Sequence, residues 1–212
     1  DSMAAVIIKD MDAIKKEYGR KRRTAIENAE EAVYEEKKME EMEVCFLMDR
    51  FGYMKLIDKN AYERNKEAVH NENKYVFNCM NTDKICIFTD TGKMHTIKAV
   101  DIPLGRFRDK GTPVDNLSNY DSSQERMLYV APVGQLRSDR LLFVTKTSMC
   151  KLVEGAEFDV AKRTIASTKL ADEDELIFIG SASEMEQIVL QSHGGCFLRF
   201  LTQEVSTMKK TA

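Results

Sequence analysis

The sequence predicts a mainly β fold, a propeller-like array of blades with about four strands each, preceded by an N-terminal helical segment. Two observations lead to this class. Apolar residues in the first 23 positions recur at helical spacing, whereas from residue 44 onward they gather into short runs separated by turn residues. A hairpin-like pattern then recurs four times, which is typical of an array of repeated units.

The first two segments contain no such hairpins. Residues 3–18 are expected to form a helix, because Ile7, Met11, Ile14 and Tyr18 have the four–three–four spacing of a coiled-coil stripe. Gly19 favours a helix end, so we assign residues 1–23 to a helical arm. Residues 24–43 contain eight Glu and two Lys and too little apolar surface for a core. We assign this segment to an acidic, partly helical linker.

Four hairpins are predicted from residue 44 to the end, because each apolar run meets a tight turn and is followed by a second strand. Their turn residues are Gly52, Gly92, Ser148 and Gly195. The hairpins align as CFLMDRFGYMKLI, ICIFTDTGKMHTI, LLFVTKTSMCKLV and IVLQSHGGCFLRF, residues 45–57, 85–97, 141–153 and 188–200. The third residue after the turn is Lys55, His95, Lys151 or Leu198, with Arg199 beside it in the last repeat and Lys98 further along in the second.

Each of the last three hairpins also has an apolar strand upstream of it, at residues 75–80, 127–131 and 176–180. We expect each of these strands to belong to the blade of the hairpin that it precedes. The runs ICIF and LLFV are apolar on both strand faces, as expected for strands packed between neighbouring blades. One blade alone cannot bury both faces, so the repeats must bury one another.

Three stretches resemble the A subunit of bacterial type IIA topoisomerases, DNA gyrase and topoisomerase IV. IKKEYGRKRRTAI (14–26) resembles the end of the coiled-coil arm, and DRFGYMKLI (49–57) resembles the first-blade hairpin. FTDTGKMHTIKAVDIPLGRFRDKGTPVDNL (88–117) resembles the second hairpin and the strand after it. The resemblance implies a β-pinwheel over residues 44–212, whose blades exchange strands and around which double-stranded DNA bends.

The same resemblance implies partners and a parent activity. The parent protein would be an ATP-dependent DNA topoisomerase in the bacterial cytoplasm, associated with the nucleoid. Its partners would be the catalytic core of the same polypeptide and the ATPase B subunit. We expect this chain to be inactive by itself, because the catalytic tyrosine domain is absent from it.

Two departures from the family pattern qualify these expectations. Gyrase has a box rich in glutamine, arginine and glycine after the first hairpin, whereas residues 61–77 contain no glycine and only three basic residues. This favours a topoisomerase IV-like or degenerate gyrase-like protein. The chain ends where the fourth repeat should continue, so we expect either that it is cut there or that a blade is missing.

Bulk charge does not indicate DNA binding, because residues 44–212 contain 23 basic and 23 acidic groups. The prediction rests on clustering, since phosphate contacts need Lys and Arg on one surface. Residues 105–111 form the densest basic patch, and 161–164 and 208–210 occupy equivalent places in later repeats. The predicted DNA-binding residues are Lys55, Arg64, Lys66, Lys98, Arg106, Arg108, Lys110, Lys151, Lys162, Arg163, Arg199, Lys209 and Lys210.

Other chemistry is not predicted. The acidic run 171–175 lacks a glycine turn that would shape a metal site, and Gly194-Gly195 is a hairpin turn and not a phosphate loop. We therefore expect no catalytic residue, metal or cofactor in this chain. No apolar run approaches the roughly 18 residues of a membrane span, so no membrane partner is expected. The alternative function is a propeller-type protein-interaction platform with little DNA affinity.

Overall fold

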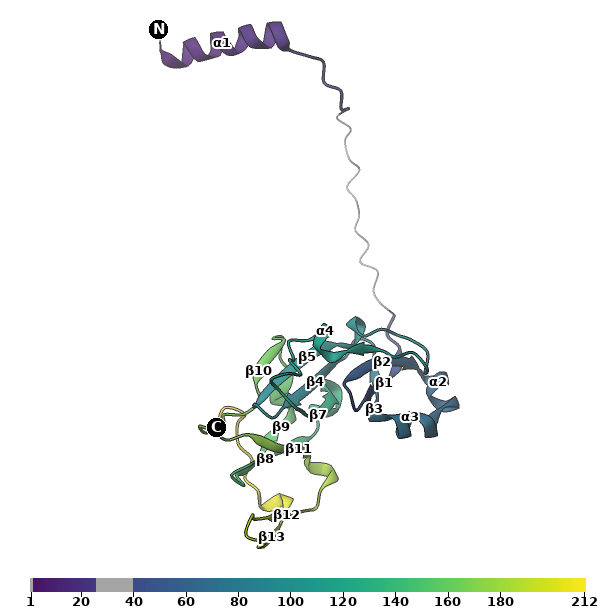
Figure 1. The fold of residues 1–212 in the computed structure, drawn as a ribbon. Coiled ribbons are helices and arrows are strands. Elements are labelled where there is room, and N and C mark those ends of the chain that lie inside the picture. Colours follow the sequence, from purple (N-terminus) through teal and green to yellow (C-terminus); the bar gives the residue numbers. More distant parts are fainter. Residues whose placement is uncertain (1, 26–39) are drawn as a thin grey trace. The chain divides into compact units, whose positions relative to one another are not determined.

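The computed structural model describes residues 2–25 and 40–212, which fall into two units. The first unit contains helix α1 (Met3–Tyr18), so the predicted N-terminal helix is confirmed (Figure 1). The Ser2 hydroxyl accepts a hydrogen bond from the Ala5 N–H at its start, and the Gly19 N–H donates to the Lys15 carbonyl at its end. Most of the predicted acidic linker, residues 26–39, lies outside the described residues.

Residues 40–212 contain all the described strands. These are β1 (Glu43–Asp49), β2 (Tyr53–Asp58), β3 (Asn73–Met80), β4 (Lys84–Thr89), β5 (Lys93–Lys98), β6 (Thr112–Pro113), β7 (Met127–Pro132), β8 (Arg140–Thr145), β9 (Cys150–Glu154), β10 (Thr164–Ala166), β11 (Leu176–Ser181), β12 (Gln187–Gln191) and β13 (Phe197–Leu201). Short α-helices are α2 (Lys59–Arg64), α3 (Lys66–Glu72), α4 (Val114–Leu117) and α5 (Val133–Leu136). Short 3-10 helices occupy Ala99–Asp101, Gly155–Phe158, Ala182–Glu184 and Thr202–Glu204.

All four predicted hairpins are present, as the antiparallel pairs β1–β2, β4–β5, β8–β9 and β12–β13. Their turn residues share a positive φ, which is 82° at Gly52, 75° at Gly92, 67° at Ser148 and 82° at Gly195. Glycine adopts this conformation without strain, and only the third turn uses a residue with a Cβ atom there. The repeated turn chemistry therefore fixes the repeated hairpin.

The assignment of the upstream strands to the following hairpins is wrong. Strands β3, β7 and β11 instead pair with the first strand of the preceding hairpin, β1, β4 and β8. The first strand of each of these hairpins thus has partners on both edges, which satisfies its backbone groups. After β3, a turn at residues 81–83 leads the chain into the next sheet. β3 is therefore close in sequence to the following hairpin but does not pair with it.

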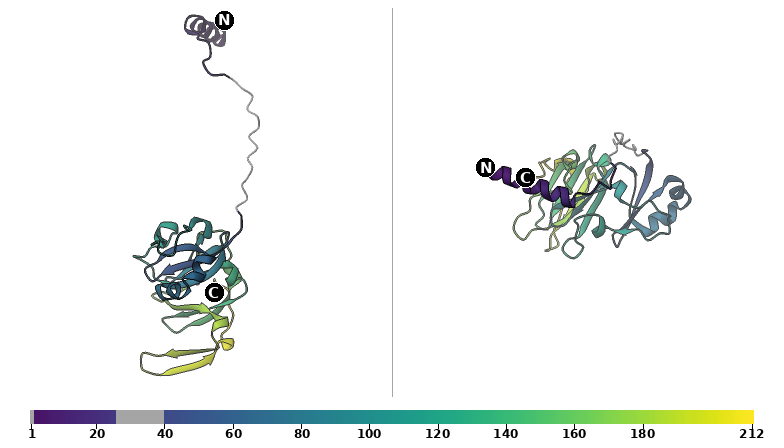
Figure 2. Two further views of the ribbon diagram at one scale, coloured as in Figure 1. Left: turned by 90° about the vertical axis from the view of Figure 1, so that its right-hand side faces the viewer. Right: turned by 90° about the horizontal axis from the view of Figure 1, so that it is seen from above.

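The fourth strands come from the next repeat. β6 follows the second hairpin but pairs with β2, and β10 follows the third hairpin but pairs with β5. The resulting sheets have the orders β3-β1-β2-β6, β7-β4-β5-β10, β11-β8-β9 and β12-β13. We call them blades 1 to 4. Figures 1 and 2 show the blades following one another in chain order toward the β12–β13 hairpin.

The central strands are buried on both faces, which shows that the core lies between successive blades. Alternate residues of one strand belong to different clusters, as Ile85 and Ile87 face blade 1 while Cys86 and Phe88 face blade 3. Blade 3 repeats this arrangement, with Leu141 directed toward blade 2 and Leu142 toward blade 4. The prediction that the repeats bury one another is confirmed.

The two outer faces of this array differ. In blade 2 one face packs against the preceding blade. The corresponding face of blade 1 contains Cys45, Leu47 and Ile57, and it is covered by Tyr62 of α2 and Val69 of α3. These helices act as a cap, which repeat arrays commonly have at an end. In blade 4 the outward-facing side chains of Val189 and Phe197 are 58% and 69% exposed.

Candidate nucleic-acid interface

Three segments join the blades at equivalent places, and we call them exchange loops 1, 2 and 3 (residues 103–111, 158–164 and 206–212). In exchange loop 1 the Pro103 carbonyl accepts from the Leu56 N–H at 3.0 Å and the Gly105 N–H donates to the Leu56 carbonyl. In exchange loop 3 the Ser206 carbonyl and the Met208 N–H make the same two bonds with Leu152. Exchange loop 2 bonds to blade 2 through the Arg163 carbonyl and the Thr96 N–H at 2.8 Å.

Exchange loop 1 presents Arg106, Arg108 and Lys110 as exposed side chains. The Asp109 carboxylate accepts the Arg106 N–H at 2.7 Å, so the acidic residue of this loop is used to hold its turn. The Lys110 Nζ atom lies 4.5 Å from the centroid of the Tyr53 ring, a cation–π distance. Three cationic groups therefore project from an ordered backbone.

Exchange loop 2 presents Lys162 and Arg163, both exposed. Its acidic residue, Asp159, pairs with Arg137 at 2.6 Å and with Lys84 at 3.3 Å. The hydrogen bond from Arg137 and that from Lys84 lower the pKa of Asp159 despite the opposing effect of burial. Because Arg137 and Lys84 already neutralise the charge of Asp159, this carboxylate does not neutralise the positive charges of Lys162 and Arg163. Lys98 and Arg163 line the same small hollow beside this loop.

Exchange loop 3 presents Lys209, which is exposed, and Lys210, which is half-buried. The Lys210 Nζ atom donates to the Glu157 carbonyl at 2.6 Å, and the Lys210 N–H donates to the Glu157 carboxylate at 3.1 Å. Lys210 thus has protein partners, whereas the Lys209 side chain makes no hydrogen bond or ion pair with residues that the structure describes.

Three of the remaining predicted residues, Arg64, Lys66 and Arg199, lie outside the exchange loops. Arg64 ends α2 and Lys66 begins α3, on the helical cap of blade 1, and the Lys66 Nζ atom is 5.9 Å from the Tyr62 ring centroid. Arg199 lies on the outward face of blade 4, opposite Val189. The position equivalent to Lys55 and Lys151 in that blade is Leu198, so the basic recurrence stops there.

Lys55 and Lys151 themselves point into the protein. The Lys55 Nζ atom donates to the carbonyl oxygens of Phe107 and Asp109, and the Lys151 Nζ atom donates to those of Lys209, Lys210 and Ala212. Burial lowers the pKa of both ammonium groups, and nearby carboxylates partly offset this effect. Sequence reasoning identified the recurrence but could not give the direction of these side chains.

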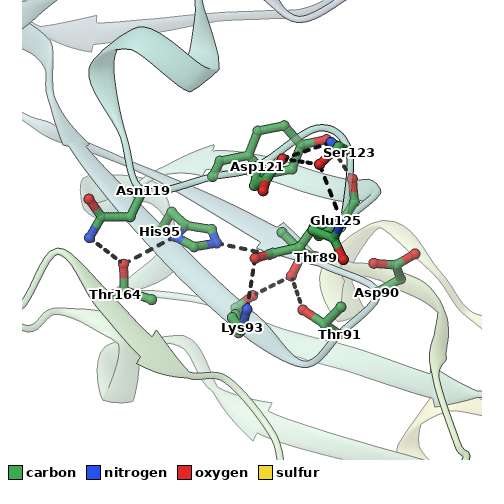
Figure 3. Close-up of polar contacts among 12 residues, drawn as sticks. Thr89, Asp90, Thr91, Lys93, His95, Asn119, Asp121, Ser123, Glu125 and Thr164 are labelled. Carbon is green, nitrogen blue, oxygen red and sulfur yellow. Dashed lines mark hydrogen bonds and ion pairs between the residues drawn. The ribbon is translucent and has the colours of Figure 1, made fainter.

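Blade 2 has a histidine at this position, in a network that sequence reasoning missed (Figure 3). His95 Nε2 lies 2.9 Å from the Glu125 carboxylate, and His95 Nδ1 lies 3.1 Å from the Thr164 hydroxyl of β10. An ionised carboxylate only accepts, so Nε2 carries the donated proton. Lys93 Nζ donates to the other Glu125 oxygen at 2.8 Å. The available sequence signal was the third position after the hairpin turn, which is His95 in this repeat and Lys55 or Lys151 in two others.

Neither a metal cluster nor a membrane-spanning helix is found among the described residues. Across residues 2–25 and 40–212, no three His, Cys, Asp or Glu side chains gather in a way that could hold a metal ion. Among the helices of the same two segments, none has the length and apolar character needed to cross a membrane.

Blades that exchange strands with their neighbours define this chain as a propeller-like β-pinwheel. The family described as "DNA gyrase C-terminal domain, beta-propeller" matches residues 83–122 and 139–183. The DNA gyrase A protein of Clostridium acetobutylicum is 27% identical over 223 residues, covering 100% of this chain and 27% of that protein. The corresponding gyrase protein of Streptococcus pneumoniae serotype 4 is 28% identical, covering 97% of this chain and 27% of its own length.

Solved structures agree on the fold. The C-terminal domain of a DNA topoisomerase IV matches with a TM-score of 0.69 at 20% identity, covering 82% of this chain and 56% of that one. The Escherichia coli ParC C-terminal domain matches with a TM-score of 0.62 at 13% identity, covering 80% of this chain and 69% of that one.

The chain has a propeller-like β-pinwheel fold, and it is similar in sequence to the DNA gyrase C-terminal domain family and to DNA gyrase A proteins. It spans about 27% of the length of the gyrase A proteins that it matches. The predicted resemblance and the predicted fold are confirmed.

Proposed function

We propose that this domain binds and bends double-stranded DNA for a type IIA topoisomerase, positioning the duplex for strand passage by the catalytic core. One observation carries the proposal: equivalent exchange loops of three successive blades present basic side chains. Because the phosphate backbone has regular charge, groups of cations that recur from blade to blade suit it without any base recognition.

The exchange loops have a net positive charge although residues 44–212 as a whole are neutral, and this supports the proposal. Exchange loop 1 contains three basic residues and one acidic residue, and exchange loop 3 contains two basic residues and none that is acidic. In exchange loop 2 the single acidic residue, Asp159, is already paired with Arg137 and Lys84. Residues 44–212 as a whole are neutral, so positive charge is concentrated at these loops.

The same proposal extends to the parent protein. The matched relatives are gyrase A proteins, so the parent would be an ATP-dependent topoisomerase that acts with an ATPase B subunit on the nucleoid in the bacterial cytoplasm. The present chain should neither cleave nor relax supercoiled plasmid, with or without ATP and magnesium. Relaxation by a pure preparation would contradict this part of the proposal.

A topoisomerase IV-like role, with bending but without gyrase-type chiral wrapping, is favoured by the cap on blade 1. Helices α2 and α3 occupy the place where the gyrase box would follow the first hairpin, and they contribute no glycine. A nicked plasmid, ligated with the bound domain and then deproteinised, should keep the linking number of the protein-free control. A shift toward positive supercoils would indicate gyrase-type wrapping.

The second candidate is a protein-interaction platform with little DNA affinity, which the neutral charge of residues 44–212 favours. A mobility-shift titration of linear duplex at low salt separates the two candidates. We expect saturable binding, together with a shortened distance between fluorophores at the two DNA ends as evidence of bending. No detectable shift at low salt would favour the platform.

A further inference from the structure

Lys55 and Lys151 occupy the same position in blades 1 and 3. Each is the third residue after the hairpin turn, and each lies opposite the central strand, Lys55 opposite Leu47 and Lys151 opposite Phe143. Neither side chain is fully exposed. This position faces the exchange loop that comes from the next repeat.

The carbonyl groups that they contact are equivalent as well. Leu56 forms a bridge to Leu104 and Leu152 forms a bridge to Thr207, which sets an offset of 103 residues (207 − 104) between the two loops. This offset places Phe107 with Lys210 and Asp109 with Ala212. Lys55 Nζ donates to the carbonyls of Phe107 and Asp109, and Lys151 Nζ donates to those of Lys210 and Ala212. The pattern thus recurs although the loop sequences RFRD and KKTA differ.

The chemistry of these contacts is that of an internal cation within a loop. A lysine ammonium group has three donors and no acceptor, so two or three backbone carbonyls nearly satisfy it. Lys55 Nζ donates to the Asp109 carbonyl at 2.5 Å, and it lies 5.4 Å from the Phe107 ring centroid. Lys151 Nζ is 2.6 Å from the Ala212 carbonyl oxygen. These donors are already used, which disfavours their direct contact with a phosphate.

We propose that Lys55 and Lys151 are positioning residues, which hold exchange loops 1 and 3 in the shape that presents their basic side chains to DNA. Three cations of exchange loop 1, Arg106, Arg108 and Lys110, alternate in sequence with the two residues whose carbonyls Lys55 binds. The DNA part of this inference rests on the proposed function. The anchoring part concerns the free protein and is independent of it.

Hydrogen exchange on the free protein tests the anchoring. In Lys55→Met the side-chain length is nearly kept and the donors are lost. We expect the Gly105 and Asp109 amides, which are hydrogen-bonded to Leu56 and Arg106, to exchange at least about tenfold faster, while amides of β4 and β5 are unchanged. Lys59→Met is the matched control, because Lys59 is exposed and contacts Glu43 and, among the described residues, no backbone carbonyl.

Lys151→Met provides a second test, with the Met208 amide as its reporter. If Lys55→Met fails to fold, this second variant still tests the anchoring. Unchanged exchange in exchange loops 1 and 3 would overturn the anchoring, whatever the DNA affinity.

A double-mutant cycle on linear duplex DNA tests the positioning. Lys55→Met should weaken binding by at least about threefold in the parent chain, but by almost nothing when Arg106, Arg108 and Lys110 are already alanine. A direct phosphate contact would instead cause the same loss in both backgrounds and make the salt slope shallower by about 0.9 in each. That result would overturn the positioning role. Absence of DNA binding by the parent chain would refute the proposed function and the DNA part of the inference, while the exchange measurement would still decide the anchoring.

Discussion

His95 Nε2 lies 2.9 Å from the carboxylate of Glu125, and both side chains are almost completely buried, with 1% and 3% exposure. This contact joins β5 to the segment that precedes β7, and the Thr164 hydroxyl extends it to the exchanged strand β10. Burial raises the pKa of Glu125, but hydrogen bonds from Lys93, His95 and Thr89 outweigh it and lower the pKa to about 2. The folded state therefore favours the ionised carboxylate, whose partner His95 also contacts the exchanged strand β10.

The first prediction concerns the pH dependence of stability. A carboxyl group whose pKa is lowered from 4.5 to about 2 in the folded state contributes stability above pH 4.5, and loses it as the pH falls toward 2. At pH 7, Glu125→Gln should lower the free energy of unfolding by about 3 kcal/mol, since one pKa unit corresponds to roughly 1.4 kcal/mol. The difference from the parent should shrink below pH 4.5.

Urea unfolding from pH 7 to pH 3 measures this difference. Glu184→Gln is the control, because Glu184 is exposed and its side chain makes no hydrogen bond or ion pair among the described residues. A destabilisation by Glu125→Gln that is the same at all pH values would show that ionisation of Glu125 is not the source.

The second prediction concerns Gly111, where exchange loop 1 enters β6. Its φ is +81°, and a Cβ atom there would lie 2.6 Å from the Met54 carbonyl oxygen. Gly111→Ala should therefore destabilise the fold by at least about 2 kcal/mol in urea unfolding, since the left-handed conformation and the backbone clash both oppose it. Gly194→Ala, whose Cβ would meet only the Ser192 hydroxyl at 3.9 Å, should change stability much less. Equal effects of the two substitutions would argue against the close β2–β6 approach.

The third prediction concerns Ser148, the one hairpin turn residue of the set that is not glycine. Its φ of 67° is strained for a residue with a Cβ atom. Ser148→Gly should raise the free energy of unfolding by up to about 1 kcal/mol, because the relief of strain exceeds the added entropy of the unfolded chain. Ser206→Gly, at a serine without a positive φ, should lower it. Thermal unfolding of both variants decides the point, and a destabilised Ser148→Gly would contradict the strain.

The hairpins could be predicted from sequence because their signals are local. An apolar run and a turn residue that accepts a positive φ lie within about 13 positions of each other, as in ICIFTDTGKMHTI. The partners of β3, β7 and β11 could not be predicted, since runs of similar apolar character fit either neighbouring hairpin. The exchanged strands β6 and β10 have only two and three residues, too few for a periodic signal.

Some residues of the candidate site could likewise be predicted from local sequence signals, and others could not. The cations of the exchange loops could be found because they recur in charged, turn-rich segments. The inward direction of Lys55 and Lys151 could not, because residue type alone does not distinguish a phosphate contact from a carbonyl contact. Glu125 was missed because it lies 30 positions from His95, and only the fold brings the two together.

The central claim is that DNA lies along the exchange loops, and the salt dependence of binding tests it most directly. Replacing Arg106, Arg108 and Lys110 by alanine should weaken binding to unrelated duplexes alike and make the slope of log affinity against log salt shallower by about 2.7, or 0.9 per phosphate contact. Replacing Lys59, Lys146 and Lys169, three exposed lysines outside the exchange loops, removes the same charge and should leave the slope nearly unchanged. Equal changes in the two triple variants, or none in the first, would contradict the claim.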